Sequence, residues 1–352
     1  MLAAMAFPSV LPEPRVPDPA TAPPLNWGIL APGFIAGQFA SALRIATRQR
    51  VVAVGSRSPE KARAFAAEHG VPAAYGSYEQ LVADPQVQAV YVASPHSEHA
   101  AQALLAIEAG KHVLVEKSFT RNAREARRVV DAARKRGVAL MEAMWARFLP
   151  HTDIVRQLLA DGMLGELESL TADHGQRLDP NEVPRLHDPK LAGGALLDLG
   201  IYPVSFAAFV LGRPGAILAS AELTPTGVDR HVSAVFTRFA DHPHAQALVN
   251  CTLAAKTPTT ASVSGRDARI ELDDAFYQPG RVRLVSRTGV TITSEPPVLF
   301  GHHGLAYEAA HFAQLVADGF TESPRLPLDE TVAIMEVLDA IRSQVKVRYP
   351  GE

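Results

Sequence analysis

The sequence predicts two domains: an α/β domain with a parallel sheet and helices on both faces, then an α+β domain with a large, mostly antiparallel open β-sheet. In the first half, short apolar runs alternate with helical segments, whereas in the second half strand-like runs follow one another with few helices between them. The length of 352 residues also exceeds one ordinary core. We expect residues 1–24 to form a proline-rich leader or arm, 25–146 the first domain, and 147–352 the second, whose last helices pack back on the first.

Composition limits the classes of partner. The chain is 47% hydrophobic and 20% charged, and its formal net charge is −3, which provides neither a basic stripe for nucleic acid nor a polybasic membrane patch. Its single cysteine, Cys251, cannot form an intramolecular disulfide, and the 13 histidines show no metal-ligand spacing. The leader lacks the pattern of a secretory signal, and we expect no apolar stretch near the roughly 20 residues of a membrane span. A cytoplasmic protein that binds small molecules, without a metal, is predicted.

The first strand-to-helix turn has features of a phosphate-binding site. The run LNWGILA at 25–31 reads as a buried strand, and APGFIAGQFASAL at 31–43 turns and becomes helical. Ala31 and Gly33 lie in the turn, and Phe34 and Ile35 begin the helix, so a pyrophosphate there meets backbone amides at the helix amino end. We include these four residues as cofactor contacts. Small residues also occur at ordinary turns, and that alternative stays open.

The end of the second strand indicates which dinucleotide is bound. VVAVG at 51–55 is followed by Ser56 and Arg57, with Lys61 one helical turn further on. An acidic residue at this position would select NAD, whereas a hydroxyl and a guanidinium suit a 2′-phosphate. NADP is therefore favoured over NAD. A helix start capped by Ser58 is the competing interpretation, and it gives no role to Arg57.

The alternation continues as in a Rossmann-type sheet. Strands are expected at 89–93, 112–115 and 138–141, and helices at 60–69, 78–83, 99–109 and 123–136. The segment SPHSEH follows the strand at 89–93, where Ser94, His96 and His99 would contact the nicotinamide half of a cofactor. These residues could equally form a turn and a helix start.

The strand at 112–115 ends in Glu116 and Lys117. Burying an ammonium is costly, and the carboxyl ends of parallel strands face the ligand crevice. We therefore assign Glu116 and Lys117 to cofactor or catalytic contact. The competing interpretation is that Lys117 only leads into a loop.

The second half combines a strand-rich region with one apolar helix. Strands are expected at 166–174, 217–223, 232–239, 245–252, 260–264, 269–272 and 282–285, after a helix at 152–160. The far face of such a sheet needs a cover, which favours a homodimer or higher homo-oligomer. Within the apolar helix at 193–211, Asp198 and Tyr202 are four residues apart and share a face. They form either a hydrogen-bonded core pair or a substrate contact.

Five further residues concern the substrate. Trp145, Arg147 and Phe148 follow the last strand of the first domain, at a domain junction where pockets concentrate. They are assigned to the substrate wall, although they could equally join the domains. Arg185 and His187, in the loop before the apolar helix, are candidate rim residues.

Together these segments resemble the Gfo/Idh/MocA oxidoreductases, most closely the branch of dimeric dihydrodiol dehydrogenase and NADP-dependent D-xylose dehydrogenase. The resemblance rests on GILAPGFIA at 28–36, YGSYEQL at 75–81, GKHVLVEKS at 110–118, MEAMWARFLP at 141–150, AGGALLDLGIYPV at 192–204, ASVSG at 261–265 and AYEAAHF at 306–312. It implies hydride transfer between C4 of a nicotinamide and a carbinol or carbonyl carbon, in a subunit that dimerises through its second sheet.

The resemblance also assigns roles and shows departures. The Glu-Lys-Pro motif of the family falls on Glu116, Lys117 and Ser118, so serine replaces the proline, and Ala31 replaces the first glycine of the turn. Its Asp-x-x-x-His pair falls on Asp198 and Tyr202. Tyr202 is then the acid/base, Lys117 lowers its pKa, and Asp198 fixes the substrate or Lys117; Lys117 as the proton acceptor is the alternative.

The predicted activity is NADP-dependent oxidation of an aldose at C1 or of a related vicinal diol. Two alternatives remain open. One is another sugar oxidoreductase or ketoreductase that retains NADP, because the leader is similar in composition to the arm that covers the cofactor in glucose–fructose oxidoreductase. The other is a non-catalytic NADP-sensing protein.

Overall fold

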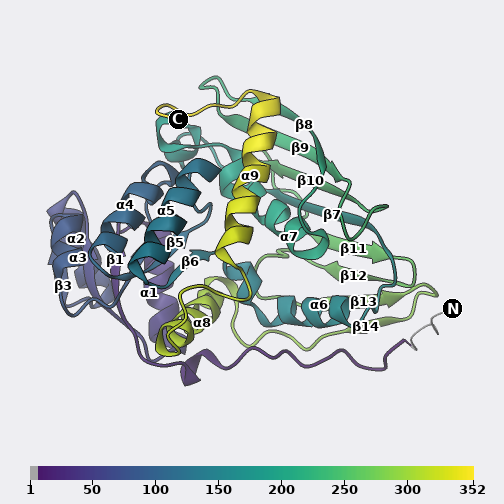
Figure 1. Ribbon diagram of the computed structural model, residues 1–352, viewed down its shortest axis with the longest axis horizontal. Coiled ribbons are helices and arrows are strands. Elements are labelled where there is room, and N and C mark those ends of the chain that lie inside the picture. The colour runs from purple at the N-terminus through teal and green to yellow at the C-terminus, as the bar shows by residue number, and fades with distance from the viewer. Residues whose placement is uncertain (1–6) are drawn as a thin grey trace.

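The computed structural model describes residues 7–352, so residues 1–6 of the predicted leader lie outside the described part. Within residues 7–352 a six-stranded parallel sheet forms in the order β3-β2-β1-β4-β5-β6 (Figure 1). Its strands are β1 Asn26–Leu30, β2 Arg50–Gly55, β3 Ala73–Tyr75, β4 Ala89–Val92, β5 His112–Glu116 and β6 Leu140–Ala143. The helices between them are α1 Phe34–Ala46, α2 Pro59–His69, α3 Tyr78–Ala83, α4 His96–Glu108 and α5 Ala123–Arg136. The predicted Rossmann-type sheet is confirmed.

Local chemistry sets the ends of these helices. Ser58 accepts a hydrogen bond from the Lys61 amide at the start of α2, and Asn122 accepts one from the Glu125 amide at the start of α5. Both helices end at a glycine with positive φ. The Ser58 cap that competed with the cofactor interpretation therefore exists, and it leaves the Arg57 side chain free for another role.

Strand order determines where a ligand can bind. β1 lies between β2 and β4. Strands β2 and β3 are therefore added on one side of β1, and strands β4 to β6 on its other side. Right-handed crossovers then place α1 on one face and α4 and α5 on the other. The loops after β1 and β4 diverge, which opens a crevice at the carboxyl edge of the sheet.

The second sheet has eight strands within the described residues, in the order β14-β13-β12-β11-β7-β10-β9-β8. All neighbouring pairs are antiparallel except β7 and β10, which are parallel. The strands are β7 Leu167–Gly175, β8 Ala216–Leu223, β9 Asp229–Thr237, β10 Gln246–Thr252, β11 Ala261–Gly265, β12 Ala268–Leu272, β13 Val282–Ser286 and β14 Thr291–Thr293. The predicted mostly antiparallel sheet is confirmed, and the short β14 was not predicted.

The two faces of this sheet differ. α7 (Ile201–Leu211) packs on the inner face against β7 and β10. On the outer face, Leu218 and Leu248 are 72% and 48% exposed.

The apolar helix corrects the expectation that no stretch has the length and composition of a membrane span. The helical stretch Pro189–Leu211 has 23 residues and a mean hydropathy of 1.7, enough by length and composition for such a span. In this fold 89% of its apolar window is buried, as in the core helix of a soluble protein.

The last helices connect the two sheets. α8 (Leu305–Ala317) packs on α1, and α9 (Leu328–Val345) contacts both α5 and β8. Figure 1 shows α9 standing between the parallel sheet and the larger sheet. The C-terminal segment thus holds the two halves of the molecule in one arrangement.

The proline-rich arm runs along the outside of α6 (Pro150–Ala160). The Arg15 amide donates to Asp153 at 2.7 Å, and Gln157 donates to the Glu13 carbonyl at 2.8 Å. η1 (Pro19–Thr21), at the end of the arm, packs on α8. The arm therefore lies along α6 and α8, and none of residues 7–24 lines the cavity described below. This placement gives no support, within one chain, to a cofactor-covering arm.

Candidate active site

A cavity of about 990 Å³ lies between the carboxyl edge of the parallel sheet and the start of α7. Most residues predicted from the sequence line it. These are Ala31, Gly33, Phe34, Ile35, Ser56, Arg57, Lys61, Ser94, His96, Glu116, Lys117, Trp145, Arg185, Asp198 and Tyr202. Folding thus brings to one cavity residues that lie up to 171 positions apart in the sequence, from Ala31 to Tyr202.

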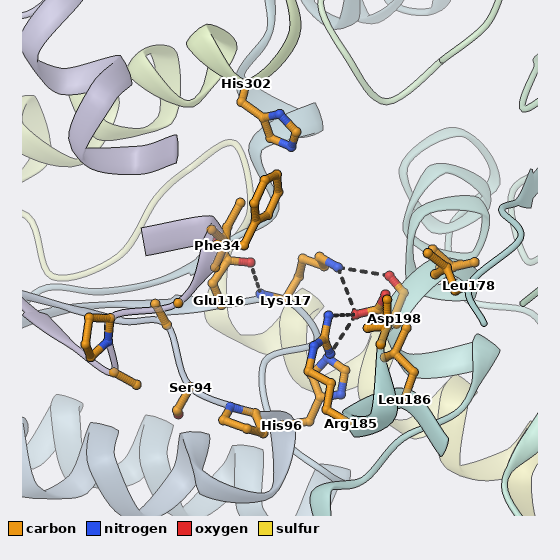
Figure 2. A pocket seen from close by; sticks show the side chains of 18 of the residues that line it. Phe34, Ser94, His96, Glu116, Lys117, Leu178, Arg185, Leu186, Asp198 and His302 are labelled. Carbon is orange, nitrogen blue, oxygen red and sulfur yellow. Dashed lines mark hydrogen bonds and ion pairs between the residues drawn. The ribbon is translucent and has the colours of Figure 1, made fainter. Parts of the chain in front are cut away.

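Lys117 extends from the end of β5 toward the second domain (Figure 2). Its ammonium donates to the backbone oxygen of Asp198 at 2.9 Å and lies 3.7 Å from the Asp198 carboxylate. The Glu116 carboxylate accepts the Lys117 amide at 3.2 Å. A charge at the edge of one sheet is therefore held by a residue from the other half of the chain.

Ser118, at the position of the family proline, adds a second link between the halves. Its side chain is fully buried, and its hydroxyl donates to the Leu197 carbonyl at 2.8 Å. Its own carbonyl contacts the His99 ring at 2.9 Å. A proline here could make no hydroxyl bond, so serine ties the Lys117 loop to the helix that carries Asp198.

That helix begins with an irregular turn. Residues Leu196–Gly200 form a π-helix, a form often found at functional sites. The buried Asp229 of β9 accepts the Leu196 amide at 2.5 Å, and burial raises the pKa of Asp229 to about 6. Gly194 has φ +116°, and a Cβ there would lie 2.2 Å from the Asp229 carboxylate. The glycine therefore allows the close approach that fixes the start of this helix.

Asp198 is the centre of a charge cluster. Arg185 lies 3.2 Å from its carboxylate and Lys117 3.7 Å, and His96 lies 3.9 Å away (Figure 2). Burial alone would raise the pKa of Asp198, but Lys117 and then Arg185 hold it well below its usual value. Burial also lowers the pKa of His96 to about 3, so this imidazole is neutral. Asp198 is therefore an anion that orients the Lys117 ammonium.

Tyr202 presents its hydroxyl to the same cavity. Trp145 donates its indole N–H to the Tyr202 hydroxyl at 3.0 Å, and the Tyr277 ring stacks on Tyr202 at 4.2 Å. Burial, followed by Tyr277 and Glu116, raises the pKa of Tyr202 well above 10. The Lys117 ammonium lies over the Tyr202 ring, 5.1 Å from the centroid, where a cation favours the phenolate, but burial outweighs it, so the net lowering of this pKa that we predicted is not found. The free phenol is therefore protonated and suited to donate a proton.

Buried carboxyl groups lie behind Lys117. Tyr91 donates a hydrogen bond to Glu116, and burial raises the pKa of Glu116. Glu142 accepts the Phe119 amide at 3.1 Å, and burial raises the pKa of Glu142 to about 7. Both groups are sources of pH-dependent stability close to the site.

Glu142→Gln is expected to stabilise the fold in a pH-dependent way. The folded-state pKa of about 7 lies above the unfolded value of 4.5, so above pH 7 the folded state holds an unfavourable carboxylate. The variant should gain up to about 3 kcal/mol at pH 8 and less than about 1 kcal/mol at pH 5, where wild type binds the proton. Urea unfolding at the two pH values measures this, and Glu68→Gln on the exposed side of α2 is the control. An equal gain at both values would contradict it.

The dinucleotide turn leaves backbone amides and open space for a phosphate. α1 begins at Gly33 without a side-chain cap, so its first amides have no side-chain acceptor. A Cβ on Gly33 would meet no atom within 4 Å and would project into the cavity. Ala31 has φ +67°, a conformation in which glycine is usually found. The turn fits a pyrophosphate, and the alanine leaves this fit intact at the cost of a strained φ.

Four residue assignments are corrected by the structure. His99 is fully buried between the carbonyls of Ser94 and Ser118, so it braces two loops and does not contact the cavity. Arg147 is buried and pairs with Glu330 at 2.5 Å. Phe148 is fully buried in the core. Arg147 and Phe148 belong to η2 (Trp145–Phe148), and only Trp145 of that turn reaches the cavity, because the turn points its side chains in different directions. His187, which contacts the Leu178 carbonyl, also lies off the cavity lining.

Several lining residues were not identified from the sequence. Tyr78 lies beside Arg57, whereas His174, Gln176, Tyr277, Gln278 and His302 surround Trp145 and Tyr202. His302 stacks on Trp145 with the rings 5.8 Å apart and contacts the edge of Phe34. Tyr78 is the first residue of α3 and His302 lies in the short helix η6 (Gly301–Gly304), whereas the others lie in loops or near strand ends, where periodicity carries no signal.

Comparison with known families agrees with this geometry. Residues 25–144 match the "Oxidoreductase family, NAD-binding Rossmann fold", and residues 153–271 match the "GFO/IDH/MocA C-terminal domain". The chain belongs to the Gfo/Idh/MocA oxidoreductase family. The resemblance seen in the sequence is therefore confirmed, and a Gfo/Idh/MocA protein is an oxidoreductase with a Rossmann domain for its nicotinamide cofactor.

Individual Gfo/Idh/MocA members are similar over nearly the whole chain. A trans-1,2-dihydrobenzene-1,2-diol dehydrogenase from Macaca fuscata fuscata is 38% identical, covering 93% of this chain and 99% of the relative, and the Homo sapiens protein of that name is 37% identical over the same shares. An aldose-aldose oxidoreductase from Caulobacter crescentus has a TM-score of 0.81 at 26% identity, over 92% of this chain and 98% of that one. A 3-ketoreductase from Actinomadura kijaniata, solved with NADP and TDP-benzene, has a TM-score of 0.80 at 28% identity over the same shares.

Proposed function

We propose that this protein is an NADP-dependent dehydrogenase that interconverts a carbinol and a carbonyl, at C1 of an aldose or in a related vicinal diol. The observation that carries the proposal is the convergence of Lys117 and Tyr202 on a cavity that also contains the dinucleotide turn. The names of the relatives, which refer to diols, aldoses and ketones, support chemistry at CH–OH groups.

The side chains have complementary roles in this proposal. In the reducing direction the protonated Tyr202 phenol donates its proton to the carbonyl oxygen and becomes a phenolate. In the oxidising direction the phenolate form of Tyr202 accepts the proton of the substrate hydroxyl. The Lys117 ammonium stabilises negative charge on the same oxygen, and Asp198 positions it. Bound nicotinamide supplies or accepts hydride at C4.

Residues at and shortly after the end of β2 would set the preference for NADP or NAD. Ser56 and Arg57 line the cavity there with Lys61, and the segment from Gly55 to Ser58 contains no acidic residue to bind a 2′-hydroxyl. This arrangement supports NADP over NAD. A guanidinium suits a phosphate because it offers several donors in a fixed plane.

Arg57→Ala is expected to raise KM for NADP by about 10- to 100-fold, since a charge-assisted hydrogen bond contributes about 1.5–3 kcal/mol. KM for NAD should change less than about twofold. Initial rates with each cofactor measure both constants. Arg63→Ala, on α2 shortly after Arg57 but off the cavity lining, is the control. An equal loss with both cofactors would remove Arg57 from 2′-phosphate recognition.

We also propose that the protein is a homodimer and that it is cytoplasmic. The outer face of the eight-stranded sheet exposes Leu218 and Leu248, and a second copy would cover this face in a homodimer. Sedimentation at micromolar concentration tests it. The single cysteine, Cys251, supports the predicted cytoplasmic location.

Turnover of a substrate panel tests the function directly. Aldoses, polyols and vicinal diols are offered with NAD and with NADP, and formation of the reduced cofactor is followed by absorbance. We expect reduction of NADP with at least one aldose or diol. Tight NADP binding without turnover of any compound would instead support a cofactor-sensing protein.

A further inference from the structure

A second cavity, of about 440 Å³, lies between α6, α7 and α9 (Figure 1). Its lining shares no residue with that of the active-site cavity. Among the residues that the structure describes, its charged lining consists of one carboxyl group, from Glu330, and four guanidinium groups, from Arg147, Arg156, Arg213 and Arg325. The rest is small or apolar and includes Phe209, Ile334 and Val337. The proposed reaction uses none of these side chains.

The Phe209 ring holds two of the guanidinium groups in place. The guanidinium carbons of Arg147 and Arg156 lie 4.8 and 5.3 Å from its centroid. Arg147 also donates to Glu330 at 2.5 Å, and Arg156 donates to the Arg147 carbonyl at 3.2 Å and to Asp153 at 2.9 Å. These cations are therefore positioned before a ligand arrives, which lowers the entropic cost of binding one.

Arg325 is a largely buried cation with weak partners. Its side chain is 22% exposed, and its guanidinium lies 4.0 Å from the Asp153 carboxylate and donates to the Arg15 carbonyl at 3.4 Å. Asp153 already accepts hydrogen bonds from the Arg15 amide at 2.7 Å, from Arg156 at 2.9 Å and from Gln157 at 3.1 Å. Burial lowers the pKa of Arg325, and the charge of Arg156 lowers it further. An anion from outside the chain would relieve this repulsion and supply the missing acceptor.

The ion pairs around the cavity leave an excess of positive charge. Five guanidinium groups share three carboxylates, in the pairs Arg147–Glu330, Arg156–Asp153, Arg325–Asp153, Arg213–Glu336 and Arg127–Glu336. Glu142 also acts on Arg147, but burial raises the pKa of Glu142 to about 7, so it is mostly protonated at about pH 6.5. Two positive charges are thus uncompensated within these pairs, and a dianion would balance them.

We propose that this cavity binds a phosphate monoester with a small apolar body, at a site separate from the active site. Arg156 and Arg325 have unused N–H groups for the phosphate oxygens, whereas Phe209, Ile334 and Val337 contact the apolar body. A phosphate monoester carries a charge of about −1.5 to −2 near neutral pH, whereas a carboxylate of the same shape carries only one. The volume of the cavity is within the range of small-molecule sites.

The test is calorimetry at constant ionic strength and about pH 6.5, with phenyl phosphate as the probe and NADP-saturated protein. NADP fills the phosphate sites of the crevice, and phenyl phosphate has no carbinol or carbonyl carbon to react. We expect one phenyl phosphate per chain with Kd below about 1 mM. Benzoate, which has one charge on the same ring, should bind at least about tenfold more weakly.

Arg325→Gln should weaken the binding of phenyl phosphate by about 10- to 100-fold, because it removes a charge-assisted donor. Arg325→Lys keeps the charge and should retain part of the affinity. Arg283→Gln is the matched control, since Arg283 pairs with Glu271 and Asp273 outside the lining of this cavity. Thermal unfolding of each variant verifies that it is folded.

Three results would overturn the inference. A Kd above about 1 mM in wild type would remove the site. Equal binding by Arg325→Gln would place the probe elsewhere, such as in the active-site cavity. Benzoate binding as tight as that of phenyl phosphate would exclude recognition of a dianion. Because no turnover is measured, a failure of the proposed dehydrogenase activity would leave this test intact.

Discussion

Tyr202→Phe is expected to lower kcat by about 10²- to 10⁴-fold, the range found when a general acid or base is removed. The substitution deletes the hydroxyl that accepts the Trp145 indole N–H at 3.0 Å but keeps the ring that stacks on Tyr277. KM for the cofactor should therefore stay within about twofold. Steady-state rates with NADP and the best substrate from the panel measure both constants.

Tyr307→Phe provides a control for the Tyr202 substitution, because Tyr307 lies on α8 and does not line the cavity. This variant should retain wild-type rates. Near-native turnover by Tyr202→Phe would contradict the assignment of Tyr202 as the acid/base. Lys117 would then be the proton donor and acceptor, which is the alternative that the sequence leaves open.

Lys117→Met is expected to lower kcat by about 10²- to 10³-fold, the range for loss of one charged or hydrogen-bonding group that stabilises a developing oxyanion. Its charge is also the first of the influences that lower the pKa of Asp198, followed by the charge of Arg185. The variant should therefore raise the pKa of Asp198. Rates as a function of pH, together with titration of the Asp198 carboxyl by NMR, measure the two effects.

Lys117→Arg separates charge from geometry. It keeps a cation near Asp198 but replaces a compact ammonium by a planar guanidinium. We expect the pKa of Asp198 to remain low in this variant while kcat still falls. Recovery of wild-type kcat in Lys117→Arg would mean that charge alone is required, and unchanged turnover in Lys117→Met would exclude Lys117 from the reaction.

Much of the fold could be predicted because its signals are local. The parallel strands are short apolar runs bounded by turn residues, and the helices carry caps such as Ser58 and Gly70 within their own sequence. The edge strand β14 was missed because it has only three residues, and Thr291 and Thr293 are exposed. The parallel pairing of β7 and β10 was missed because strand order is a property of the whole sheet.

The site residues, like the strands, divide into those that the local sequence predicts and those that depend on the folded chain. Gly33, Arg57 and Lys117 follow strands of the parallel sheet, and strand ends can be located from the sequence. Arg147 and Phe148 were assigned wrongly because a single turn, η2, directs neighbouring side chains to the core and to the cavity. Tyr277 was missed because it lies in a connection between strands with no periodic pattern.

By itself the sequence determined the Rossmann-type sheet, the family, and the strand ends from which Lys117 and Arg57 extend, since hydrophobic period and motif spacing are encoded over a few neighbouring residues. Only the tertiary structure decided how these parts act on one another. It placed the Asp198 carbonyl 2.9 Å from the Lys117 ammonium and raised the pKa of Tyr202 through burial. It also placed Gln176, Tyr277 and Gln278 beside the phenol. Distances and burial depend on segments far apart in the chain, and local pattern carries no information about either.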